Sequence, residues 1–178
     1  MTAGTAGALA AMAARFHPRQ PGTIAAVTGT NGKSSTVEFL RQIWAHAGHD
    51  AACLGTLGVT RASGRTQVGY TTPDAIALHR SLDALAADGV THLAMEASSH
   101  GLKQRRMDGV RVTAAAFTNL SQDHLDYHPD FDDYFASKMR LFNALSKAGS
   151  PAVVWMDSDW ASRVADGCRA AGLDVIEA

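Results

Sequence analysis

The chain has 178 residues, 46% of them hydrophobic and 19% charged, a composition typical of one soluble globular domain with a sizeable core. Its net charge of −1 gives no reason to expect nucleic acid or an anionic membrane surface as a partner. The sequence has no apolar run of membrane-spanning length and no secretory signal, and Cys53 and Cys168 are expected to be free thiols in a reducing cytoplasm.

The N-terminal part predicts a helix, a strand and a second helix in succession. Residues 7–16 are Ala-rich and favour a short helix, which Pro18 and Pro21 end. Residues 23–27 are small and β-branched and predict a buried strand. Apolar residues then recur at helical spacing over residues 37–47, before a glycine suited to a helix end.

A glycine-containing stretch, Thr28-Gly29-Thr30-Asn31-Gly32-Lys33-Ser34-Ser35, lies between that strand and that helix and predicts a phosphate-binding loop. Glycines let backbone N–H groups approach phosphate oxygens, and the helix N-terminus favours negative charge. Lys33 can reach the terminal phosphates, and the Ser34 hydroxyl can bind Mg²⁺. The common pattern G-x-x-x-x-G-K-[ST] has a glycine where this chain has Val27, so the alternative is an ordinary turn with a solvated lysine.

A second strand is expected at residues 51–54, followed by a hairpin of residues 59–61 and 65–68. In the next segment, Thr71-Thr72-Pro73-Asp74, Thr72 is the predicted N-cap of a helix and Pro73 its first residue. As a helix start, this segment needs no other function.

Two further strands, at residues 91–95 and 110–117, are expected to end in polar residues. Glu96 ends the first, where ligands bind in open parallel sheets, although a glutamate there can also be merely solvated. The second leads into Asp123-His124-Leu125-Asp126-Tyr127-His128. Two histidines and two aspartates in six residues indicate a metal or proton-transfer site, the alternative being a structural or exposed pair. The basic run at residues 103–106 is interpreted as a solvated surface patch.

The next predicted helix has a lysine on its core-facing side. Its apolar stripe is formed by Phe131, Tyr134, Phe135, Leu141, Phe142 and Leu145, and Lys138 lies on the same stripe. Snorkelling explains this position if the stem is buried and the ammonium reaches the rim. The alternative is a partly desolvated lysine with a lowered pKa, whose neutral amine is available for chemistry.

A strand at residues 152–155, a helix at 159–171 and a short strand at 173–176 complete the chain. Because strands alternate with helices apart from the hairpin, the sequence predicts an α/β fold. Its sheet is expected to be doubly wound and mainly parallel, with helices on both faces.

Several segments together resemble the central, ATP-binding domain of the Mur ligases, in particular the MurE type. The phosphate loop is shared by all Mur ligases and by folylpolyglutamate synthetases. Two segments are more particular to MurE, namely Ser98-Ser99-His100-Gly101-Leu102 and Asp123-His124-Leu125-Asp126-Tyr127-His128. Thr71-Thr72-Pro73, Phe117-Thr118-Asn119-Leu120-Ser121 and Lys138 also match, so the resemblance covers nearly the whole chain.

The resemblance implies a role for each matching residue. The ATP phosphates would be held by Gly29, Thr30, Asn31, Gly32, Lys33, Ser34 and Ser35, with Asn119 near the nucleotide. The catalytic residues would be Lys33, Glu96, His124 and Lys138. Ser34 and Glu96 would bind a first Mg²⁺ ion and His124 a second, and Lys138 would carry CO₂ as a carbamate that supports the metal. UDP-MurNAc-L-Ala-D-Glu would be held by Thr71, Thr72, Ser98, Gln104 and Arg106. Tyr70 replaces a substrate-binding asparagine of some relatives, so that contact is not expected.

For the parent enzyme, the resemblance implies ATP-driven amide formation in bacterial peptidoglycan synthesis, in the cytoplasm. The D-glutamyl carboxylate becomes an acyl phosphate, and diaminopimelate or lysine then displaces phosphate. Residues 1–22 would be a linker from a UDP-binding domain, and residues 23–178 a shortened ATP-binding domain. Because an amino-acid-binding domain is not expected in this chain, we expect that it does not ligate alone. We also expect a monomer, with no nucleic-acid or membrane partner.

Two other interpretations stay open, a non-catalytic nucleotide-binding module and a folylpolyglutamate-type ligase domain. A folate ligase should not need Ser98-Ser99-His100 with Arg106 downstream. A P-loop kinase is expected to show the strict glycine pattern, which Val27 contradicts.

Overall fold

A computed structural model describes residues 4–66, 71–121 and 127–178. Its strands are β1 (Thr23–Thr28), β2 (Ala51–Gly55), β3 (Gly58–Arg61), β4 (Gly64–Thr66), β5 (His92–Glu96), β6 (Ala114–Phe117), β7 (Pro151–Val154) and β8 (Asp174–Glu177). Its helices are α1 (Thr5–Phe16), α2 (Lys33–His46), α3 (Ala75–Ala87), α4 (Ser99–Lys103), α5 (Phe131–Arg140) and α6 (Ala161–Ala170). A π-helical turn, η1 (Leu141–Leu145), extends α5.

The strands form one eight-stranded sheet in the order β4-β3-β2-β5-β1-β6-β7-β8. Six strands, from β2 to β8 in this order, are parallel, and the antiparallel hairpin β3–β4 extends the β2 edge. The predicted doubly wound, mainly parallel sheet with a hairpin is therefore confirmed. Since β1 lies between β5 and β6, the carboxyl ends of these three strands meet beside the loop that follows β1.

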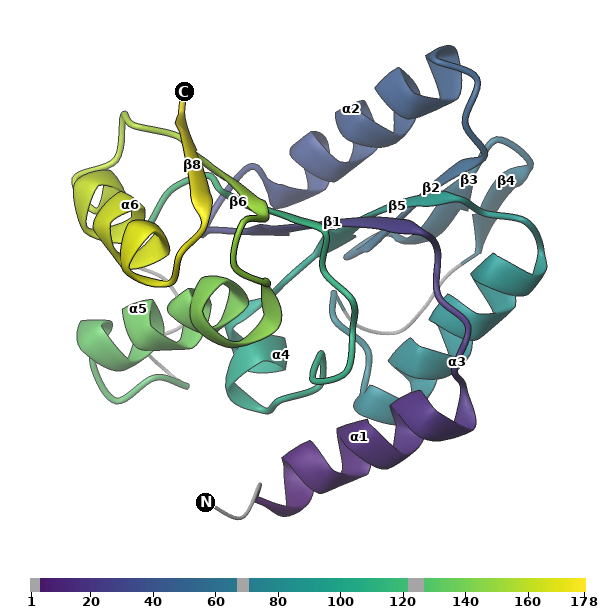
Figure 1. The fold of residues 1–178 in the computed structure, drawn as a ribbon, viewed down its shortest axis with the longest axis horizontal. Helices are drawn as coiled ribbons and strands as arrows, with labels where there is room; N and C mark the ends of the chain where they lie inside the picture. Colours follow the sequence, from purple (N-terminus) through teal and green to yellow (C-terminus); the bar gives the residue numbers. More distant parts are fainter. Residues whose placement is uncertain (1–3, 67–70, 122–126) are drawn as a thin grey trace.

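Helices cover the two faces of the sheet unequally (Figure 1). α2 lies on one face, whereas α3, α4, α5 and α6 lie on the other, with α1 packed on α3. The larger core lies on the four-helix side, and a smaller core of Val27, Val37, Cys53 and Ala94 lies under α2. Right-handed crossovers explain this division, because only the β1–α2–β2 connection runs toward the hairpin edge, while the later ones run the opposite way.

Most predicted elements are present with ends shifted by one or two residues, but the start of α3 was predicted wrongly. Its N-cap is Asp74, whose carboxylate accepts a hydrogen bond from the backbone N–H of Ala77 at 2.9 Å. Thr72 is instead buried, and its hydroxyl contacts the carbonyl of Glu96. An aspartate and a threonine are both good caps, and tertiary contacts of Thr72 decide between them.

The strand predicted at residues 110–117 is also shorter than expected, since β6 begins at Ala114. Before it, Val112 makes only an isolated bridge with Ser146. The Thr113 hydroxyl accepts from the N–H of Ile24 and donates to its carbonyl, at 2.9 and 3.0 Å. The Thr113 side chain therefore takes the N–H of Ile24 that a longer β6 would bond through its backbone, although the backbone N–H of Thr113 still donates to the Ile24 carbonyl at 2.9 Å.

The apolar stripe of α5 and η1 is confirmed, but snorkelling of Lys138 is wrong. Tyr134, Leu141 and Phe142 on this stripe are 0–1% exposed. Lys138 is 2% exposed, and its ammonium donates to the carbonyl of Gly29 at 2.8 Å instead of reaching solvent. The whole side chain is thus directed into the protein, toward the predicted phosphate loop.

Candidate functional site

The loop between β1 and α2 depends on two glycines. Gly29 has φ +150°, and a Cβ added there would lie 1.9 Å from the hydroxyl oxygen of Thr118. Gly32 has φ +86° and is the N-cap of α2, where no side chain caps the helix. The N-cap of α2 thus makes no side-chain hydrogen bond to the helix start, which is the arrangement of an anion-binding helix N-terminus.

The end of β6 fixes the shape of this loop. Asn119 accepts from the N–H of Asn31 through its side-chain oxygen at 2.9 Å, and its carbonyl accepts from the N–H of Thr30 at 2.9 Å. The Thr118 hydroxyl donates to the carbonyl of Asn31 at 2.7 Å. Asn119, predicted to lie near a nucleotide, is thus placed beside the loop, whereas Ser35 is exposed on the first turn of α2.

The ammonium of Lys33 folds back onto the loop. It donates to the carbonyl oxygens of Gly29 and Thr30 at 2.9 and 2.7 Å. Lys138 donates to the same Gly29 oxygen from the opposite side of the chain, with its nitrogen 4.3 Å from the centre of the Tyr134 ring. Two cationic side chains, 105 positions apart in sequence, therefore converge on one carbonyl of the loop.

A buried carboxylate lies next to the start of α2. Glu96 is 2% exposed and accepts from the Ser34 hydroxyl at 2.8 Å. It also accepts from the N–H and the hydroxyl of Thr56, at 2.9 and 3.2 Å. Charge-assisted hydrogen bonds of this kind contribute about 1.5–3 kcal/mol each, which offsets part of the cost of burying the carboxylate. Glu96 is therefore directed at the loop and is not merely solvated.

Gly55 and Thr56 were missed by the sequence interpretation. A Cβ added at Gly55 would lie 1.9 Å from a carboxylate oxygen of Glu96, so this position leaves the space that the carboxylate fills. Both residues stand at the carboxyl end of β2, next to β5. A glycine and a threonine directly after a predicted buried strand were the available signal.

The five residues predicted to hold a sugar-nucleotide dipeptide are connected by hydrogen bonds. The Thr72 hydroxyl accepts from the N–H and the hydroxyl of Ser98, at 3.1 and 2.9 Å. Arg106 donates to the carbonyl of Thr72 at 2.7 Å and twice to the side-chain oxygen of Gln104. The Thr71 hydroxyl lies 2.9 Å from that of Thr56, which links this group to Glu96.

The basic run is therefore only partly a solvated patch. Arg106 is half-buried among the contacts above, and Lys103 pairs with Asp133 at 2.6 Å. Arg105, with φ +56°, is the more exposed member and lies 3.6 Å from Asp108.

His124 lies outside the described residues, and so do Asp123 and Asp126. Their predicted metal or proton-transfer role stays a prediction. The second histidine of the motif, His128, is described and is buried. Among the described residues, no group of three or more His, Cys, Asp or Glu side chains is close enough to hold a metal ion.

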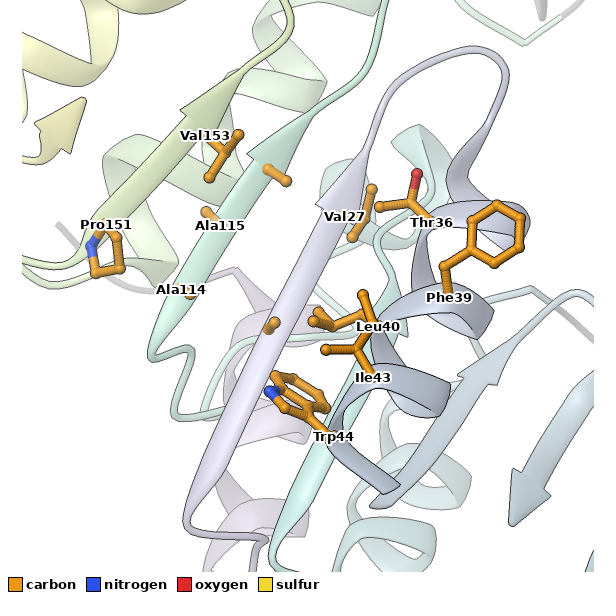
Figure 2. Close-up of a pocket in the computed structure, with 12 residues that line it drawn as sticks. Val27, Thr36, Phe39, Leu40, Ile43, Trp44, Ala114, Ala115, Pro151 and Val153 are labelled. Carbon is orange, nitrogen blue, oxygen red and sulfur yellow. The ribbon is translucent and has the colours of Figure 1, made fainter. Parts of the chain in front are cut away.

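Two large hollows adjoin α2, besides a small one of about 20 Å³ between Ser34 and Glu96. One has a volume of about 350 Å³ and lies beside the loop, with Asn31, Gly32, Asn119 and Trp155 among its lining residues. The other, of about 460 Å³, is an apolar groove between α2 and strands β1, β6 and β7 (Figure 2). Phe39, Ile43 and Trp44 form its wall on α2, and small residues of β6 form its floor. The first hollow adjoins the polar groups of the loop, whereas the second has almost no polar lining.

No helix in the described parts of the chain is long and apolar enough to cross a membrane.

Comparisons with known proteins find ligases among the similar sequences. A ligase named UDP-N-acetylmuramoyl-L-alanyl-D-glutamate--2,6-diaminopimelate ligase from Rhizobium meliloti is 58% identical over 168 residues, which are 94% of this chain and 34% of that protein. The ligase of the same name from Agrobacterium fabrum is 56% identical over 168 residues, with the same coverage. The chain thus spans about a third of the length of the curated relatives it matches.

Solved structures place the fold in the same group. A structure of a ligase of that name is 31% identical with a TM-score of 0.82, covering 97% of this chain and 35% of the other. A structure of E. coli FolC with ADP is 18% identical with a TM-score of 0.69, covering 97% of this chain and 46% of that one, and so shows a similar fold alone.

A family profile described as the Mur ligase middle domain matches residues 27–178, a span that begins at the last part of β1 and includes the loop, Glu96 and Lys138. The chain therefore belongs to the Mur ligase middle domain family.

Proposed function

We propose that this chain carries the nucleotide-binding and phosphoryl-transfer part of an ATP-dependent ligase. The parent enzyme joins 2,6-diaminopimelate to the D-glutamyl carboxylate of UDP-MurNAc-L-Ala-D-Glu. The names of the relatives supply the two substrates. The observation that carries the proposal is the convergence of Lys33, Lys138 and the Ser34–Glu96 pair on one glycine loop at the carboxyl edge of the sheet.

The polar groups around the loop suit the charge that develops during phosphoryl transfer. Lys33 exchanges its two loop carbonyls for the oxygens of the transferring phosphoryl group. The backbone N–H groups at the start of α2 bind the inner phosphates. Gly29 and Gly32 allow the backbone to approach because neither carries a Cβ. The substrate carboxylate attacks the γ-phosphate in line, the bond to the bridging oxygen breaks and ADP leaves. The amine of the amino acid then attacks the acyl phosphate, inorganic phosphate leaves, and the nitrogen loses a proton to give the amide.

A magnesium ion fits the donor set at Ser34 and Glu96. A hydroxyl and a carboxylate are hard oxygen ligands, and they already lie 2.8 Å apart. When bound, the ion neutralises charge on the outer phosphates and so favours their displacement. Thr56 holds the carboxylate in place through two hydrogen bonds, which leaves one Glu96 oxygen shared between Ser34 and Thr56.

A carbamate on Lys138 is compatible with its hydrogen bond. A carbamylated nitrogen keeps one N–H, which can still donate to the Gly29 carbonyl, while the new anionic group extends beyond it. The burial of Lys138 supports this chemistry because a neutral amine, the form that captures CO₂, is favoured where an ammonium loses its hydration. An intact mass with and without bicarbonate tests it.

The group formed by Thr71, Thr72, Ser98, Gln104 and Arg106 is proposed to bind the sugar-nucleotide dipeptide. Arg106→Ala should abolish measurable binding of UDP-MurNAc-L-Ala-D-Glu in calorimetry. Arg105→Ala is the matched control, since its side chain contacts only Asp108 among the interactions described and is 41% exposed. Equal affinity of both variants and wild type would remove Arg106 from the site.

Glu96→Gln tests the nucleotide proposal. Glutamine has the same shape, and its NH₂ group can donate to the Thr56 hydroxyl, which then donates to Thr71. The fold should therefore persist, while Mg²⁺-dependent binding of a non-hydrolysable ATP analogue weakens by about tenfold to a hundredfold, roughly 1.4–2.8 kcal/mol. Unchanged Mg²⁺ dependence in a folded Glu96→Gln variant would contradict the metal site.

The non-catalytic module stays the second candidate, and turnover separates it from the ligase. Transfer of the γ-phosphate to the dipeptide carboxylate, detected as trapped acyl hydroxamate, favours the ligase.

A further inference from the structure

Asp133 connects three segments that carry the candidate site. One of its carboxylate oxygens accepts from the ammonium of Lys103 and lies 2.6 Å from Nδ1 of His128. Lys103 is the last residue of α4, His128 precedes α5, and Asp133 is in the first turn of α5. Hydrogen bonds from Lys103, and to a smaller extent from His128, lower the pKa of Asp133. The Asp133 carboxylate is therefore the acceptor in both contacts, and Nδ1 of His128 carries the proton. The first turn of α5 is thereby tied both to α4 and to the loop before it.

His128 is the motif residue that the proposed chemistry does not use. Its side chain is 0% exposed, and its Nε2 has no hydrogen-bond partner within the residues the structure describes. A buried polar atom without a partner costs about 1–3 kcal/mol. If position 128 only filled space, an apolar side chain would give a more stable fold than this imidazole.

The imidazole ring contacts the side chain that reaches the phosphate loop. The centre of the His128 ring is 5.0 Å from that of Tyr134, which is fully buried. The Tyr134 hydroxyl lies 3.1 Å from that of Thr30 in the loop, and the Lys138 nitrogen lies over the Tyr134 ring. His128, Tyr134 and Thr30 are therefore a continuous chain of contacts from α5 to the loop.

We propose that His128 is a positioning residue for nucleotide binding. Its bond to Asp133 fixes the ring, the ring fixes Tyr134, and Tyr134 holds Thr30 and the ammonium of Lys138 in the geometry of the loop. The effect of His128 on nucleotide affinity rests on the proposed nucleotide function. Its effect on the conformation of the loop without ligand does not.

Two substitutions separate the two nitrogens of the ring. In His128→Asn the amide nitrogen replaces Nδ1 and can still donate to Asp133. In His128→Gln the amide lies farther out and loses that contact. Using the full 178-residue chain, we expect His128→Gln to shift the backbone N–H resonances of Gly29 and Thr30 without ligand and to weaken binding of the ATP analogue about tenfold. His128→Asn keeps the contact with Asp133 but lacks the ring that packs on Tyr134, so it should move the same resonances less and weaken binding less than His128→Gln does.

Tyr134→Phe provides the matched test of the route, because it removes only the hydroxyl that contacts Thr30. If His128 acts through the Tyr134 hydroxyl, the double variant His128→Gln/Tyr134→Phe binds the analogue no more weakly than Tyr134→Phe alone. If the role of His128 is purely structural, the affinity losses of the two single variants multiply in the double variant. The affinity of each variant then also falls in step with its melting temperature.

The two proposals can fail separately. If wild type does not bind the analogue, the nucleotide function fails, and the loop resonances still test His128. If wild type binds and His128→Gln leaves both affinity and the Thr30 resonance unchanged, the positioning role is refuted. Should His128→Gln not fold, Asp133→Ala removes the carboxylate that Nδ1 of His128 contacts, at a partly exposed position. Failure of that variant to move the Thr30 resonance overturns the proposal as well.

Discussion

Replacing Gly55 with alanine should damage the site through the carboxylate of Glu96. The added Cβ would lie 1.9 Å from one carboxylate oxygen, 2.5 Å from its carbon and 2.7 Å from Cγ. Glu96 is 2% exposed and held by three hydrogen bonds, so it cannot swing into solvent without breaking them. The carboxylate must retreat by more than 1 Å to reach a tolerable contact, which separates it from Ser34.

Two costs add in this variant. Overpacking of a buried position destabilises a protein by about 1–3 kcal/mol. Complete loss of a charge-assisted hydrogen bond costs about 1.5–3 kcal/mol. Since the carboxylate can relax in part, we expect a net loss of about 3 kcal/mol in unfolding free energy. For a domain of this length, that corresponds to a fall of roughly 6–12 °C in melting temperature. Urea unfolding and calorimetry measure both quantities.

Gly22→Ala is the matched control. Its added Cβ has only the Thr91 carbonyl within reach, at 3.9 Å, and its φ is not in the left-handed region. It should change the unfolding free energy by less than about 0.5 kcal/mol. A Gly55→Ala variant as stable as Gly22→Ala, with unaltered Mg²⁺-dependent nucleotide binding, would refute the view that Gly55 makes room for the carboxylate.

Two further predictions concern ionisable groups away from the loop. Burial raises the pKa of the Cys53 and Cys168 thiols to about 11. At pH 8 both should therefore react with a disulfide reagent far more slowly in native than in unfolded protein. Rapid reaction of one thiol per native molecule would contradict this. The Arg41 guanidinium lowers the pKa of Glu38 to about 2, and a lowered pKa contributes stability above the unfolded value that is lost as pH falls from about 4.5 toward 2. The free energy of unfolding in urea should therefore fall less between pH 7 and pH 2.5 in Glu38→Gln than in wild type, by on the order of 1 kcal/mol. The difference is small because solvent screens this partly exposed pair.

The sequence was most informative where a single local pattern decides the structure. The strand, the loop with Gly29 and Gly32, and the helix were predicted in the order in which the structure has them. The stripe on α5 correctly placed Lys138 among core residues, but periodicity gives the direction of a side chain and not where its end lies. The Gly29 carbonyl, 109 residues earlier, accepts from this buried ammonium, and the local pattern around Lys138 does not contain that contact.

What escaped the sequence depends on which strands are neighbours. Thr56 holds Glu96 because β2 lies next to β5, and the order of strands is a property of crossovers that no local pattern contains. Thr118 supports the loop for the same reason, since β6 adjoins β1. The wrong helix start at Thr72 likewise reflects a contact with Ser98, 26 residues away, that outweighs its capping preference.

The ammonium of Lys33, closed onto the carbonyls of Gly29 and Thr30, has a kinetic consequence. A triphosphate arriving at this loop meets a cation that is already engaged, so encounter alone does not complete the complex. Two hydrogen bonds must open before the lysine can turn outward, and association should then be slower than diffusion allows and should level off at high ligand concentration. Stopped-flow traces that saturate would reveal that opening step.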